Sequence, residues 1–211
     1  MADLPVDSRG YPVPWFVAWI DGPDGSKVPE FRAMDGQKFG RAIRERRCWV
    51  CGERLGSYLC FVIGPMCAIN RISSEPPSHL ECAQWSARNC PFMSKPQMVR
   101  RETGPGVDPS VIQSAKGNVA GVMIERNPGV SLLWVCRDYE IQRDPNEKPL
   151  LYIGEPLRVE WWAQGRAATR AEVEHSIETG LPLLLAAAGS RGEVESIDRR
   201  RKEVDALLPA A

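Results

Sequence analysis

The chain has 211 residues, 43% of them hydrophobic and 26% charged, which is typical of a globular protein large enough to bury a core. Its 27 Lys and Arg residues are balanced by 27 Asp and Glu residues, which argues against a protein that coats DNA through an overall positive charge. Nucleic-acid binding would therefore have to depend on a local basic patch.

Two features of the chain point to a reducing cytoplasm as its location. The opening residues MADLPVDSRG lack the basic start and apolar run of a secretory signal, and the longest apolar stretch, 181–189, is too short to cross a bilayer. The seven cysteines are odd in number and unevenly spread, which disfavours a secreted disulfide framework. We therefore expect free thiols that serve packing or metal binding.

The opening region, 1–47, is expected to hold a strand and a basic helix. The pattern predicts a strand over WFVAWI (15–20), a turn over DGPDGS (21–26) and a helix over 34–47. Phe39 and Ile43 would share the apolar face of that helix because they are four residues apart.

The next region, 48–93, carries six of the seven cysteines and begins with Cys48 and Cys51 in RCWVCGERLG. Four interpretations compete for this pair. A thioredoxin-like redox pair should follow a strand of a βαβ unit, which is not predicted here, and a disulfide conflicts with the expected compartment. Two unrelated buried thiols are the third interpretation, and a zinc knuckle, whose two-residue spacer lets both sulfurs meet one ion, is the fourth.

A knuckle supplies only two ligands, and His79 and Cys82 are the expected second pair. Ser78 and Glu81 form a capping-box pattern, which predicts Ser78 as the N-cap and His79 as the first residue of a helix ending near Pro91. His79 and Cys82 would then share one face of the first turn, where the helix dipole favours a thiolate. Pro76 and Pro77 help to fix the start of this helix.

The order knuckle, hairpin (54–64), loop and helix with two ligands in its first turn resembles a treble-clef zinc finger over residues 48–91. The resemblance implies Zn²⁺ held by Cys48, Cys51, His79 and Cys82. The long spacer before His79 leaves Cys67 as an alternative ligand in its place. Three other cysteines are expected to be small buried groups: Cys60, Cys90 and Cys136.

Two enzyme classes share parts of this pattern. HLE at 79–81 matches the H-x-E element of zinc nucleobase deaminases, but their P-C-x-x-C should follow it, and here the CxxC comes first. HNH endonucleases also use a treble clef, but they need a catalytic histidine after the knuckle, and none lies between Cys51 and Ser78. A closed set of four ligands favours a structural zinc, so we expect a protein that is not an enzyme.

The remainder of the chain is expected to be a linker followed by an antiparallel sheet and helices. Residues 94–117 form the expected linker or long loop, and 118–211 the expected sheet and helices. Strands are predicted over 118–126, 131–142 and 150–154, as a meander. Helices are predicted over 156–165 and over 193–208. A further helix is predicted between them, from a capping box of Thr169 and Glu172 to Thr179, with Gly180 as its terminator.

The overall expectation is an α+β protein with an embedded zinc-finger region, similar to small proteins of phages or bacteria. Its expected function is that of a zinc-stabilised module that binds nucleic acid or a protein partner. The alternatives are an HNH-like nuclease and a structural or assembly protein. The candidate contact residues are Arg41, Arg44 and Arg47, beside the knuckle, and Arg71, in the loop after it.

Overall fold

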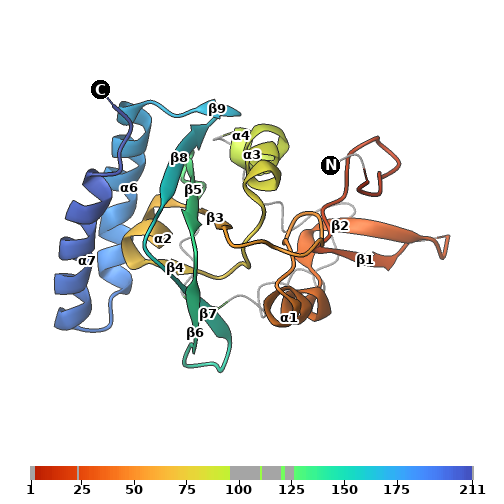
Figure 1. Cartoon of the computed structure of the whole chain (residues 1–211), viewed down its shortest axis with the longest axis horizontal. Coiled ribbons are helices and arrows are strands. Elements are labelled where there is room, and N and C mark those ends of the chain that lie inside the picture. Colours follow the sequence, from red (N-terminus) through yellow and green to blue (C-terminus); the bar gives the residue numbers. More distant parts are fainter. Residues whose placement is uncertain (1–2, 23, 96–109, 111–119, 122–125, 211) are drawn as a thin grey trace.

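The structure, a computed structural model, describes residues 3–22, 24–95, 110, 120–121 and 126–210. The predicted α+β class is confirmed: every strand pairing between these residues is antiparallel, and two long helices lie at the C-terminal side of the molecule (Figure 1). None of the described helices combines the length and hydropathy needed to span a bilayer.

The described strands form three sheets. A hairpin pairs β1 (Val17–Asp21) with β2 (Lys27–Met34). The largest sheet has the order β3 (Leu59–Ile63), β5 (Ser131–Cys136), β8 (Arg158–Ala163), β9 (Arg166–Ala167). The third has the order β4 (Ile72–Ser73), β7 (Pro149–Ile153), β6 (Tyr139–Arg143).

The described helices are α1 (Gly36–Glu45), α2 (Pro65–Asn70), α3 (Leu80–Asn89), α4 (Pro91–Ser94), α6 (Arg170–Ala187) and α7 (Arg191–Asp205). The helix predicted over 34–47 is thus confirmed as α1, two residues shorter at each end. The helix predicted over 193–208 is confirmed as α7, which begins at Arg191. Most of the strand predicted over 118–126 and of the linker over 94–117 lies outside the described residues.

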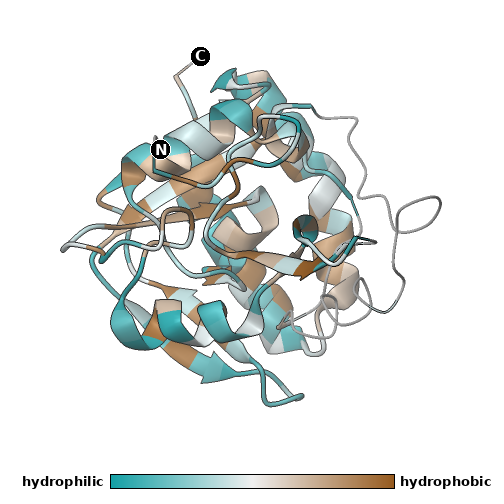
Figure 2. Cartoon of the chain, turned by 90° about the vertical axis from the view of Figure 1, so that its right-hand side faces the viewer, coloured by the Kyte–Doolittle hydropathy of each residue, from teal (hydrophilic) through white to brown (hydrophobic). Residues whose placement is uncertain are grey.

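Strand β5 is the centre of the core and is buried along its whole length. Leu132, Trp134 and Cys136 join the core that includes residues of α6 and α7, whereas Leu133 and Val135 pack with Ala83 and Ala87 of α3. Successive side chains of a strand point to opposite faces, so the apolar run needs cover on both. The main sheet therefore lies between α3 and the C-terminal helices, with hydrophobic residues concentrated in the interior (Figures 1 and 2).

The prediction of a helix over 156–165 was wrong, because this segment contains strand β8. Trp161 joins the core cluster on the α6–α7 side, and Trp162 packs against the cluster on the α3 side. On a helix these adjacent rings could not both reach a core, whereas a strand places them on opposite faces of the sheet.

The capping box of α6 is confirmed, but its predicted end is wrong. Thr169 accepts a hydrogen bond from the backbone N–H of Glu172, whose carboxylate accepts one from the backbone N–H of Thr169. The helix then continues through Gly180 and Pro182 to Ala187. A Cβ at Gly180 would lie 3.1 Å from Met66 Cε and 3.1 Å from Arg126 Nη2, so this glycine allows close packing inside the helix.

The predicted meander and hairpin also need correction. The segment 131–142 forms two strands, β5 and β6, which belong to different sheets. Within the described part of the predicted meander, β6 pairs with β7 as a hairpin and β5 does not pair with β6. The segment 54–64 contributes one strand, β3, which pairs with β5 more than 60 residues further along the chain. Burial of Leu59, Cys60 and Phe61 explains this choice of partner, because a local hairpin would leave one face of that run exposed.

Trp49 joins the N-terminal hairpin and α1 to the CxxC segment. Its ring stacks on Phe16 at a centroid distance of 5.1 Å and meets Phe39 edge-on at 5.8 Å. The residue is only 3% exposed. Trp49 therefore packs between elements of this chain, where it joins the CxxC segment to the N-terminal region.

Candidate metal centre

The CxxC segment forms a tight backbone turn. The backbone N–H of Cys48 donates to the carbonyl of Glu53 (2.7 Å), and that of Gly52 donates to the carbonyl of Cys48 (2.9 Å). An antiparallel bridge between Arg47 and Arg54 closes the turn. Gly52 has a φ of +78°, a backbone conformation that glycine adopts with least strain, and this allows the sharp reversal after Cys51.

Helix α3 supplies the other half of the cluster, but its start differs from the predicted one. The helix begins at Leu80 with His79 as the N-cap residue, and no side chain caps it. Ser78 is instead held in a bridge with Cys60, through hydrogen bonds of 2.8 and 3.0 Å. The Ser78–Glu81 capping box is therefore wrong, because Ser78 is fixed in the extended segment that precedes the helix. His79 and Cys82 nevertheless lie within one turn of each other.

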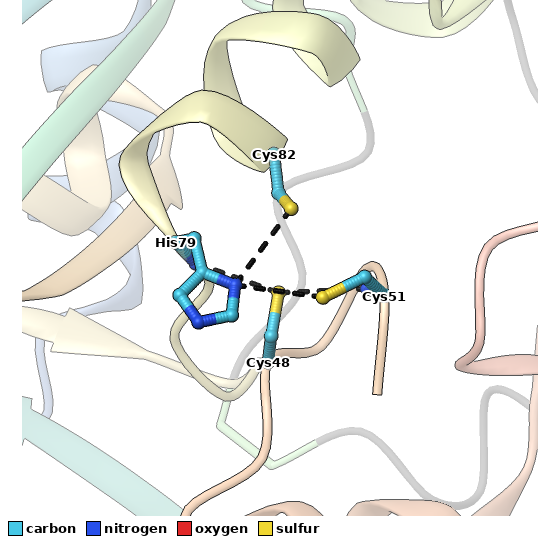
Figure 3. A group of neighbouring side chains, drawn as sticks. All are labelled: Cys48, Cys51, His79 and Cys82. Carbon is cyan, nitrogen blue, oxygen red and sulfur yellow. Dashed lines mark hydrogen bonds between the residues drawn. The ribbon is translucent and has the colours of Figure 1, made fainter. Parts of the chain in front are cut away.

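The four predicted ligands lie together (Figure 3). The cluster consists of Cys48 Sγ, Cys51 Sγ, His79 Nδ1 and Cys82 Sγ, and these atoms all lie within 4.8 Å of one another. His79 Nδ1 is 3.4 Å from Cys51 Sγ and 3.8 Å from Cys82 Sγ. Cys48 is fully buried and Cys82 is 8% exposed, so the surrounding protein shields the centre on that side.

The imidazole of His79 is oriented by a hydrogen bond on the side away from the sulfurs. Nε2 lies 3.1 Å from the backbone carbonyl of Arg54. A carbonyl can only accept, so Nε2 donates to it, and the neutral imidazole in this orientation would present the lone pair of Nδ1 to the sulfurs. The backbone of the CxxC turn thus sets the tautomer that metal binding requires, and no sequence pattern indicated this role for Arg54.

Backbone N–H groups also point at the sulfur of Cys48. Those of Cys51 and His79 lie 3.5 and 3.4 Å from it. The Cys82 thiol donates a further hydrogen bond, and together these donors lower the pKa of Cys48 to about 4 against the opposing effect of burial. The pKa of Cys51 is raised, mainly by burial, and that of Cys82 is raised, mainly because its thiol donates to Cys48. The centre without a cation therefore favours a single thiolate, and a bound cation would favour the thiolate at all three cysteines.

Three sulfurs and one imidazole nitrogen form a donor set suited to a borderline-soft divalent cation. Four protein donors complete a tetrahedral shell, so the arrangement offers binding and cross-linking of two chain segments. It joins the turn after α1 to the start of α3. The residues present therefore fit a metal ion, and the cluster could hold one.

The other cysteines lie apart from this cluster. Cys60 and Cys136 are 1% and 0% exposed, which confirms the prediction that they are small core groups. Cys90 is half-buried at the C-cap of α3 and so is less enclosed than predicted. Cys67, the alternative to His79, lies in α2 and is not among the four clustered donors.

The three arginines predicted beside the knuckle do not share one helical face. Arg41 lies on α1 and pairs with Glu45 at 3.1 Å, and its guanidinium lies 5.8 Å from the centroid of the Trp15 ring. Arg44 is exposed on the same helix. Arg47 lies beyond the end of α1, where it pairs with Glu45 and donates to the carbonyl of Gly52 at 3.0 Å.

Arg71 is engaged inside the fold. Its side chain is 12% exposed and pairs with Glu155 (3.1 Å) and Glu203 (2.9 Å). Its guanidinium also lies 4.8 Å from the centroid of the Trp134 ring. These contacts connect the segment after α2 to α7 and the main sheet, so both terminal nitrogens of the guanidinium pair within the chain.

Comparison with known proteins adds no relative: no protein-family model, no curated protein and no solved structure matches this chain. The functional interpretation therefore depends on the chemistry and geometry of the residues themselves.

Proposed function

We propose that the chain is a zinc-stabilised binding module in which Cys48, Cys51, His79 and Cys82 hold one structural Zn²⁺ in a treble-clef-like arrangement. Its partner is nucleic acid or another protein. The observation that carries the proposal is the convergence of these four donor atoms within 4.8 Å of one another. Zinc is favoured over other cations because Cys₃His is among its usual structural donor sets.

A structural role fits the site better than a catalytic one. Four protein donors leave no coordination position for water, and catalytic zinc usually needs that open position. The sequence holds only two histidines, His79 and His175. The first is a proposed ligand, and the second is exposed on α6, so neither has the place of the HNH general base after the knuckle.

The expected effect of the metal is to fix α3 and the CxxC turn against each other. Between them, Cys60 of β3 pairs with Ser78, directly before His79. The protein backbone thus already brings the two ligand pairs together, and the ion adds a cross-link at their closest point. Because such a site forms only in the folded chain, its binding free energy adds to folding stability.

Metal analysis of the purified protein tests the proposal. We expect about one zinc per wild-type chain, since four donors complete one tetrahedral site. Cys51→Ser and Cys82→Ser should each lose the zinc and lower the midpoint of thermal unfolding. Cys67→Ser and Cys90→Ser are matched controls, because each removes a thiol that lies outside the cluster. Both controls should retain the zinc.

Zinc retention by both cluster variants would overturn the assignment. Loss of zinc from Cys67→Ser, with retention in the His79→Ala variant, would instead make Cys67 the fourth ligand. Cleavage of plasmid DNA by the zinc-loaded protein with added Mg²⁺ would favour the HNH-like alternative. A stable oligomer that dissociates on chelation would favour the assembly role.

A further inference from the structure

A basic hollow lies beside the CxxC turn. It has a volume of about 350 Å³ and is lined by Arg44, Glu45, Arg46, Arg47 and Arg54. Its single carboxylate, Glu45, is paired with Arg41 and Arg47. Hydrogen bonds from these two guanidinium groups lower the pKa of Glu45 to about 2. The hollow therefore has an excess of positive charge at neutral pH.

Three of these arginines present guanidinium groups that no acidic side chain of the described ranges neutralises. Arg44, Arg46 and Arg54 are all exposed, and none forms an ion pair within those ranges. The one hydrogen bond of the Arg46 guanidinium within the described ranges is to the backbone carbonyl of Gly56, at 3.3 Å. A planar guanidinium with free N–H groups matches the oxygens of a phosphate, which makes the hollow suitable for a phosphate group.

An exposed aromatic ring continues this basic surface. Tyr58 is 57% exposed, and the guanidinium of Arg137 lies 5.2 Å from the centroid of its ring. The Arg46–Gly56 hydrogen bond connects the hollow to the loop that carries Tyr58. We name the set Arg44, Arg46, Arg54, Tyr58 and Arg137 the arginine–tyrosine surface.

We propose that the arginine–tyrosine surface binds single-stranded nucleic acid, with the arginines on successive phosphates and Tyr58 stacked on a base. Exposed rings beside arginines are the means by which proteins hold unpaired strands, because every unpaired base offers a π-face. A duplex would use the charges but not the ring.

The surface depends on the metal centre, so this inference rests on the proposed function. The carbonyl of Arg54 accepts the hydrogen bond of His79 Nε2, and Arg47 donates to the carbonyl of Gly52, next to Cys51. The turn that carries Cys48 and Cys51 thus also carries Arg54, one of the proposed phosphate contacts. We expect chelation of the zinc to weaken binding without removing any arginine.

Fluorescence anisotropy of the zinc-loaded full chain provides the test. The probe is a labelled single strand of about 16 nucleotides and mixed sequence, compared with the duplex of that sequence. The variants are Arg46→Ala, Arg54→Ala, Tyr58→Ala and Tyr58→Phe. Arg143→Ala is the matched control, because this exposed arginine lies on β6, outside the surface. Zinc content is measured for each variant.

We expect the single strand to bind more tightly than the duplex. The slope of log affinity against log salt should be about −3 if four arginines each neutralise one phosphate, and about 0.7 shallower after each arginine substitution. Tyr58→Ala should weaken binding about tenfold, while Tyr58→Phe and Arg143→Ala should bind like wild type.

Three results would overturn the inference: no binding of the single strand, equal binding by wild type and the arginine variants, or tighter binding of a poly-glutamate peptide than of the oligonucleotide. The last would identify an acidic protein partner instead. Each of these results in a protein that holds its zinc would leave the proposed function standing. A wild-type protein without zinc would defeat that function first.

Discussion

Gly52 shows how one residue sets the geometry of the CxxC turn. Its φ is +78°, and a Cβ there would lie 2.7 Å from Cδ1 of the Trp15 ring. The position of this glycine, directly after Cys51, is visible in the sequence and is compatible with a tight turn. The close approach of Trp15 could not be predicted, since it depends on how the N-terminal hairpin packs.

Gly52→Ala should therefore destabilise the protein. A left-handed conformation costs a residue with a Cβ about 1–2 kcal/mol, and the displacement of Trp15 adds to that. We expect the free energy of unfolding in urea to fall by about 2 kcal/mol or more. Gly56→Ala is the control, because a Cβ there would meet nothing within 4 Å. Equal stability of the two variants would contradict this account of the turn.

The four clustered donors could be predicted from the sequence, but the reason given for the second pair was partly wrong. Residue chemistry and the CxxC and HxxC spacings were sufficient, because both spacings bring two donors close in any tight turn. The predicted Ser78 cap was wrong because Ser78 pairs with Cys60 instead. That pairing depends on tertiary structure and leaves no local sequence signal.

Among the elements, those with strong local signals were predicted best. The start of α6 follows from the Thr169–Glu172 capping box, which needs only neighbouring residues. Strand β8 was not predicted, because the run RVEWWA shows no clear alternation of polar and apolar residues. Its pattern becomes clear only when the two faces of the sheet are known. Gly180 was misread as a terminator because its close neighbours, Met66 and Arg126, come from distant segments.

Thr169→Ala should weaken the start of α6. Loss of an N-cap side chain costs about 1 kcal/mol, because a backbone N–H of the first turn then loses its acceptor. We expect the midpoint of urea unfolding to fall accordingly, with an unchanged denaturant slope. Thr169→Ser should stay close to wild type, since serine caps as well as threonine. An equal loss of stability in the Thr169→Ser variant would show that the methyl group of Thr169, rather than its hydroxyl, stabilises the start of α6.

The metal region is built into the core of the whole molecule. Strand β3, which follows the CxxC turn, pairs with the central strand β5, and Cys48 and Cys82 pack in the same hydrophobic cluster as Trp134. On the other side, Trp49 packs on Phe16 and Phe39 of the N-terminal region. Residues before position 47 and after position 93 thus pack directly against the segment between them.

Zinc removal should therefore lower the stability of the whole described fold, and not only that of the segment 48–93. Since β3 and β5 share one core, we expect calorimetry to show a single transition that moves to lower temperature when the metal is chelated. Hydrogen exchange should quicken first at the backbone N–H groups of Cys48 and Gly52, and last in β5. Re-addition of zinc to the chelated protein is the control and should restore the original transition. Two transitions, of which only the first responds to chelation, would contradict this expectation. They would mean that the metal stabilises a separate unit, and that β3 can separate from β5 without unfolding of the remaining structure.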